Sequence, residues 1–305
     1  MNKLIPLMQR EWLQHRFAWM LMTLLPLALA VLLLVFGQVQ IGEEKLERAG
    51  DALPVLLAMA AIAGSTCVVF GIAWFAGLIN ISGLGRRDHA DRSIEFWMSV
   101  PVSHTQSFAA PLLVHLLIVP AVALLIGLVG GYALSLVLVT RVAGFGAWLG
   151  LPWGDILPAS VMVLLRLLAG LPLATLWLAP LMLLVVLLTA EFRRWGWVIL
   201  GVGMGLGGFV LKLVFGQPWL NEITGSLLRH AGRAMVNGGG GSFQMAGPEG
   251  SFSALQGLPA WALNDYAHAL RDLASPLLLG GLIFAAACFA LLVNWRRRGA
   301  GIAGG

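Results

Sequence analysis

The chain has 305 residues, of which 59% are hydrophobic and only 11% are charged, and its mean hydropathy is +0.88. Soluble domains contain about 25% charged residues, so this composition excludes a soluble fold. The net charge of +5 does not indicate a nucleic-acid-binding protein, because Lys and Arg occur in short runs at the ends of apolar stretches and form no basic face with aromatic residues. These properties predict an all-α integral membrane protein, with residues 1–305 forming a single transmembrane domain.

The first long apolar run covers residues 17–36 and follows Lys3, Arg10 and Arg16. It is too long for the apolar core of a signal peptide, and its sole A-x-A triplet lies inside the run. We therefore expect an uncleaved transmembrane helix that starts in the cytoplasm.

Residues 1–16, ahead of this run, contain Leu4, Met8 and Trp12 at four-residue spacing. This spacing places the three side chains on one helix face and predicts a short amphipathic helix in the cytoplasmic interface. A cytoplasmic extension of the first transmembrane helix explains the same pattern equally well.

Five further apolar runs follow, and each is long enough to cross a membrane as a helix of about 20 residues. They lie at 54–81, 108–137, 168–188, 197–215 and 276–293, and we expect residues 156–167 to form a separate interfacial helix before the fourth span. Residues 82–107 form a charged cytoplasmic loop, and residues 216–274 form an outer segment of two helices that flank the glycine run 238–241. Lys and Arg are concentrated in the predicted cytoplasmic parts, which places both termini in the cytoplasm.

Small residues inside the apolar runs predict close contacts between helices. The pairs spaced by four residues are Gly127 and Gly131, Gly201 and Gly205, and Gly203 and Gly207. This spacing is typical of helices whose backbones approach closely in lipid. Cys67 and Cys288 also lie within apolar runs, and we expect both to be small packing residues.

The sequence lacks a P-loop for ATP hydrolysis. A P-loop requires Gly-Lys-Ser/Thr, and the three lysines, Lys3, Lys45 and Lys212, all lie outside such a context. We predict that this chain is not an enzyme and binds no cofactor or metal. The alternative is an intramembrane enzyme that uses His115, His230 or His268.

Titratable residues inside the apolar runs would indicate an ion-coupled secondary transporter or a channel. None of the six runs contains Asp or Glu, and His115 is expected to be hydrogen-bonded between helices. Arg166 and Lys212 are expected to extend to the interface. Transport coupled to an ion gradient therefore remains the second hypothesis.

In the outer segment, Asp265, His268 and Asp272 recur at spacings of three and four residues. One helix face can present them to a metal ion, but two carboxylates and one His are more typical of the solvated side of an amphipathic helix. We therefore expect these residues to face solvent.

The cytoplasmic loop contains a short predicted helix. Asp91 can cap its N-terminus, Ile94, Trp97 and Met98 share one face, and Pro101 ends it. The spacing alone fits a docking element for another subunit and an interfacial helix equally well.

The string Asp-Arg-Ser-Ile-x-Phe-Trp-x-Ser-x-Pro-Val-Ser at residues 91–103 resembles the loop between the second and third spans of bacterial ABC-type exporter permeases of the type-2 class. The order of an amphipathic N-terminal helix, six spans and outer helices before the last span is also similar to that family. The resemblance implies that this loop is a coupling helix seated in a groove of the ATP-binding subunit. The implied contact residues are Asp91, Arg92, Ile94, Glu95, Phe96, Trp97 and Met98.

The same resemblance implies the partners and the location of the protein. Two ATP-binding subunits bind ATP and Mg, and a second permease copy, identical or homologous, completes the pathway in the lipid of the bacterial inner membrane. An apolar bundle with few buried charges is compatible with a drug, a peptide, a lipid-linked molecule or an ion as cargo.

Overall fold

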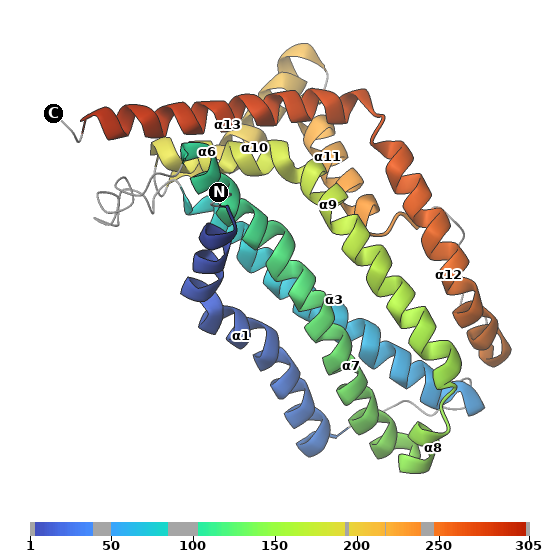
Figure 1. The fold of residues 1–305 in the computed structure, drawn as a ribbon. Coiled ribbons are helices and arrows are strands. Elements are labelled where there is room, and N and C mark those ends of the chain that lie inside the picture. Colours follow the sequence, from blue (N-terminus) through green and yellow to red (C-terminus); the bar gives the residue numbers. More distant parts are fainter. Residues whose placement is uncertain are drawn as a thin grey trace.

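The computed structural model describes residues 4–38, 50–84, 103–192, 195–216, 218–238 and 247–302. Within these ranges the chain is almost entirely helical and contains no strand (Figure 1). Six helices are long and apolar enough to cross a membrane, as the sequence predicts. They are Leu4–Phe36, Gly50–Ser82, Thr105–Ala143, Trp153–Phe192, Val198–Phe215 and Pro276–Trp295.

The described helices follow one another in a simple order. They are α1 (Leu4–Phe36), η1 (Gly50–Ala52), α3 (Leu53–Ser82), α6 (His104–Leu113), η2 (Val114–Ile118), α7 (Val119–Ala143), α8 (Phe145–Leu149), α9 (Trp153–Phe192), α10 (Gly196–Phe215), α11 (Trp219–Met235), α12 (Gly247–Asp272) and α13 (Pro276–Ile302). The third span is thus a composite of α6, a π-helical turn at η2, and α7. The predicted pair of outer helices corresponds to α11 and α12.

Helix α1 continues without interruption from Leu4 through the first span. The predicted short helix is therefore the first part of α1, which agrees with an extension of the span. Figure 1 shows a bend between the first turns of α1 and the rest of the helix. Its surroundings, interface or cytoplasm, remain a prediction.

Helix α9 is the longest of the described helices, with 40 residues, and it contains Pro158, Pro172 and Pro180. At 1.5 Å per residue it is about 60 Å long, roughly twice the thickness of the hydrocarbon core. The predicted division into an interfacial helix at 156–167 and a separate span is wrong, because one helix includes both segments.

Most of the core is built around α9. Trp177 is fully buried where α9 packs against α11, α12 and α13. Ile156 packs near the start of α9 against α3, α7 and α12, and Val186 packs near its end against α3, α6 and α13. The fourth cluster, around Trp19 and Val69, joins α1 to α3 and the third span.

Helices α3 and α7 form the most extensive helix pair, and glycine permits their close approach. A Cβ atom at Gly131 would lie 2.6 Å from Ile62 Cα, and one at Gly127 would lie 2.8 Å from Thr66 Cα. The predicted contact at these two glycines is confirmed. The hydroxyl of Ser65 also donates a hydrogen bond to the carbonyl of Gly127, at 2.7 Å.

The contacts predicted for the glycine pairs at 201–207 in α10 are not formed within the described part of the chain, although Gly196 packs closely against Thr189 of α9. Added Cβ atoms at Gly201, Gly203 and Gly205 meet open space. Helix α10 is also the least buried span, because only 6% of its apolar stretch Val198–Phe215 is buried inside the protein. Cys288 is buried as predicted, whereas Cys67 is exposed.

Figure 1 shows the N- and C-terminal ends on the same side of the helix bundle. An even number of membrane crossings produces this arrangement. That this side faces the cytoplasm stays a prediction from the distribution of Lys and Arg.

Candidate functional site

The predicted coupling helix lies outside the described residues. This applies to Asp91, Arg92, Ile94, Glu95, Phe96, Trp97 and Met98. The structure does describe both ends of the loop, Leu84 and Ser103.

Both ends of this loop are anchored to the bundle. Leu84 is buried in the same cluster as Phe108 of α6, and this cluster also includes the ends of α9 and α13. The hydroxyl of Thr189 on α9 donates to the carbonyl of Ser82, at 2.6 Å, and the Ser103 side chain caps α6 by accepting from the amide of Gln106. The two ends of the loop are therefore connected to α3, α6, α9 and α13.

A buried polar cluster, formed by Glu11, His15 and His115, joins α1 to the π-helical turn η2. Glu11 is 6% exposed and His115 is fully buried. Glu11 Oε1 lies 3.1 Å from His115 Nε2 and 3.6 Å from Nε2 of His15, one turn further along α1. The expectation that His115 is hydrogen-bonded between helices is confirmed. Its partner Glu11 precedes the first apolar run at 17–36, and α1 continues through both segments.

Aromatic rings and a glycine enclose this Glu11 cluster. The His115 ring lies 5.4 Å from the Trp19 ring and 5.6 Å from the His15 ring, between ring centroids. On the α3 side, a Cβ atom at Gly77 would lie 2.5 Å from the carbonyl oxygen of His115. His115 Nδ1 is buried and has no hydrogen-bond partner among the described residues. The cluster is therefore packed tightly, while one of its imidazole nitrogens stays unsatisfied.

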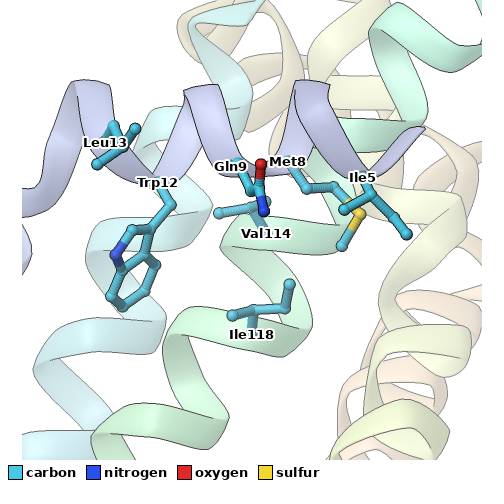
Figure 2. Close-up of a pocket in the computed structure, with 7 residues that line it drawn as sticks. All are labelled: Ile5, Met8, Gln9, Trp12, Leu13, Val114 and Ile118. Carbon is cyan, nitrogen blue, oxygen red and sulfur yellow. The ribbon is translucent and has the colours of Figure 1, made fainter. Parts of the chain in front are cut away.

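An apolar pocket of about 510 Å³ lies beside this cluster, between the first turns of α1 and η2. Figure 2 shows Met8 and Trp12 extending from α1 beside Val114 and Ile118 of the facing helix. Ile5, Gln9 and Leu13 complete the lining. The volume is within the range of small-molecule sites, and the lining suits a hydrocarbon ligand.

A second buried polar cluster, formed by Arg166 and Asp265, joins α9, α11 and α12. Arg166 Nε donates to Asp265 Oδ2 at 2.9 Å, and Nη2 lies 2.7 Å from the same oxygen as an ionic contact. Asp265 also accepts from the amides of Asn237 and Gly238, and Arg166 Nη1 donates to the carbonyl of Ala234 at 2.9 Å. This network fixes the end of α11 between the two longer helices.

The Arg166 cluster overturns two predictions. Arg166 does not extend to the interface but is 3% exposed, and Asp265 does not face solvent but is fully buried. Lys212 is exposed on α10, and its extension to the interface stays a prediction. His268 and Asp272 do not form a metal-binding group with Asp265 in the described part of the chain.

The histidines of the enzyme hypothesis lie apart in the fold. His115 belongs to the Glu11 cluster, whereas His230 on α11 stacks on Trp177 with ring centroids 4.4 Å apart. His230 Nδ1 also donates to the carbonyl of Ser226, at 2.8 Å. These contacts hold the partly buried His230 against α9.

Comparisons of the chain with known protein families, with curated proteins and with solved structures find no match. The function must therefore be inferred from the residues and their arrangement.

Proposed function

We propose that this chain is the permease subunit of an ATP-driven ABC exporter of the bacterial inner membrane. The observation that favours it most is the string at residues 91–103, which resembles the coupling loop of type-2 permeases and lies between the second and third predicted spans. The six membrane-spanning helices agree with this assignment. ATP hydrolysis takes place on a separate subunit.

In this proposal, the anchoring of the loop is the route by which ATP hydrolysis is coupled to the membrane helices. When two ATP-binding subunits close on ATP and Mg, they push on the coupling helix, with Phe96 and Trp97 as apolar anchors and Asp91, Arg92 and Glu95 as polar contacts. The force reaches α3 through Leu84 and α6 through Ser103. Thr189 and the cluster around Phe108 then transmit it to α9 and α13.

The exposed face of α10 is the surface we assign to a second permease copy. Leu206, Phe209 and Leu213 are each more than half exposed on a helix that packs little within its own chain. The open glycines at 201, 203 and 205 permit close approach of another helix. The second copy can be identical or homologous.

Affinity purification from native membranes in mild detergent, followed by mass spectrometry, tests the proposal. We expect the wild-type chain to co-purify with a stoichiometric soluble chain that contains a P-loop. The variant with Glu95→Arg and Trp97→Ala should no longer co-purify with that partner. The matched control is a double substitution of two exposed residues on α11, Leu228→Ala with Arg229→Glu, which should retain the partner. Monodisperse protein recovered alone would contradict the proposal.

An ion-coupled secondary transporter is the second candidate, and the buried Glu11 favours it. A carboxylate beside a buried His is a common arrangement for binding and releasing a proton within a membrane. Two results would support this candidate over the permease. An ion gradient would drive uptake or efflux in vesicles without ATP, and Glu11→Gln would abolish this transport. Transport that requires ATP would exclude it.

A further inference from the structure

Three potential metal ligands converge where α1 crosses η2. Glu11 Oε1 lies 3.1 Å from His115 Nε2 and 3.6 Å from His15 Nε2, and the ligand atoms of the three residues all lie within 4.8 Å of one another. In a tetrahedral site with bonds of about 2.0–2.1 Å, neighbouring ligand atoms are about 3.3 Å apart. We propose that Glu11, His15 and His115 bind a divalent transition-metal cation of the zinc class.

The ligand types define the class of metal. Two imidazoles suit Zn²⁺, Co²⁺, Ni²⁺ and Cu²⁺, whereas Mg²⁺ and Ca²⁺ prefer sites built from oxygen. The Glu11 carboxylate compensates part of the cation's charge in a buried position. Three protein ligands leave a fourth coordination position for water or an anion.

The positions of the two histidines fit a bound cation better than they fit hydrogen bonds to Glu11 alone. Both Nε2 atoms face the same oxygen of Glu11, at distances of 3.1 and 3.6 Å. A metal ion at the point on which these atoms converge accepts a lone pair from all three. The side chain of His15 is 22% exposed, which gives the ion a route of entry and lets this ligand rotate into the site.

The backbone at His115 provides a second, independent indication. His115 lies in the π-helical turn η2, and such turns within long helices are frequent at functional sites. Gly77 allows the backbone of α3 to pack directly against the His115 carbonyl. A bound ion would thus fix α1 to η2, which packs on α3 near the end of that helix at Ser82. Such a site would exist whether or not the chain is a permease.

Co²⁺ binding to the purified protein, prepared without a polyhistidine tag, tests the proposal. We expect one Co²⁺ per chain, with the intense visible absorption of a four-coordinate site, and displacement of Co²⁺ by Zn²⁺. His15→Ala and Glu11→Gln should weaken binding by about a hundredfold or more, because loss of an outer-shell partner alone costs about 10–100-fold. His268→Ala, which removes a histidine elsewhere, should bind like the wild type.

Thermal unfolding in detergent shows whether each variant is folded. His15→Ala is the most informative variant, because the His15 side chain is partly exposed and its removal should disturb the fold least. Zn²⁺ should raise the melting temperature of the wild type and of His268→Ala but not that of His15→Ala. The proposal is overturned if folded wild-type protein binds no Co²⁺, or if folded His15→Ala and Glu11→Gln bind it as tightly as the wild type.

Discussion

The two buried polar clusters of this protein differ in the kinds of groups that surround their carboxylates. At Arg166 and Asp265 the ion pair is supplemented by backbone donors and by an acceptor from α11. At Glu11 and His115 two imidazoles face one carboxylate oxygen. One buried nitrogen in each cluster, Arg166 Nη2 and His115 Nδ1, has no hydrogen-bond partner in the described ranges. The first arrangement is suited to holding helices together, whereas the second is suited to binding an ion. Substitutions in and around the two clusters should therefore differ in their effects.

The largest effect is expected at the Arg166 cluster. Asp265→Ala leaves Arg166 buried without its counter-charge, which typically costs about 3–5 kcal/mol. We expect the free energy of unfolding, measured by denaturant titration in detergent, to fall by that amount. Asp272→Ala, about two turns further along α12, should have little effect.

The combined replacement Arg166→Met and Asp265→Leu sharpens this prediction. Replacement of a buried ion pair by apolar side chains is often neutral or stabilising, so most of the lost stability should return. A double variant as unstable as Asp265→Ala would show that the hydrogen bonds from Asn237 and Gly238, and not the ion pair, determine the stability of this cluster.

An intermediate effect is expected where α3 packs against the Glu11 cluster. Gly77→Ala places a Cβ atom 2.5 Å from the His115 carbonyl, and such overpacking costs about 1–3 kcal/mol. Gly71→Ala is the matched control on the same helix, because its added Cβ meets open space. The control should be neutral or slightly stabilising in thermal unfolding. Equal behaviour of the two variants would contradict the close packing of α3 on η2.

A smaller effect is expected for Glu11→Gln. The amide retains a hydrogen bond to His115 and removes the charge, so the free energy of unfolding without metal should change by less than about 1.5 kcal/mol. Asp265→Asn, the same change in the Arg166 cluster, should cost more because it removes the counter-charge of Arg166. Comparison of the two unfolding curves measures the difference between the clusters directly, and a larger loss for Glu11→Gln would reverse our interpretation.

The smallest effect is expected for an exposed arginine. Arg141 donates to the carbonyls of Leu34, Val35 and Gly37 at the end of α1. Because its side chain is exposed, Arg141→Ala should cost less than about 1 kcal/mol in thermal unfolding. A loss comparable with that of Asp265→Ala would show that burial does not account for the difference between these arginines.

Hydropathy alone predicts most of the fold. Six apolar runs identify the six spans, because a membrane helix must satisfy its backbone internally and present apolar side chains to lipid. The contact of Gly127 and Gly131 with α3 also follows from their spacing. The continuity of α9 does not, since polar residues such as Arg166 suggest an interruption until a buried partner is known.

The two polar clusters could not be predicted from the sequence, because their partners are distant in the chain. Glu11 precedes the first apolar run and meets His115, 104 residues later. Asp265 lies in a polar segment of the chain and is buried beside Arg166, 99 residues earlier. A sequence pattern reports the neighbours along one helix, whereas these pairs depend on how helices cross.

The most direct test of the proposed function is ATP hydrolysis by the co-purified ATP-binding subunit, reconstituted in lipid vesicles with this chain. We predict that the wild-type permease stimulates hydrolysis and that the variant with Glu95→Arg and Trp97→Ala, although inserted normally, does not. Normal stimulation by that variant would contradict the assignment of residues 91–98 as the coupling helix.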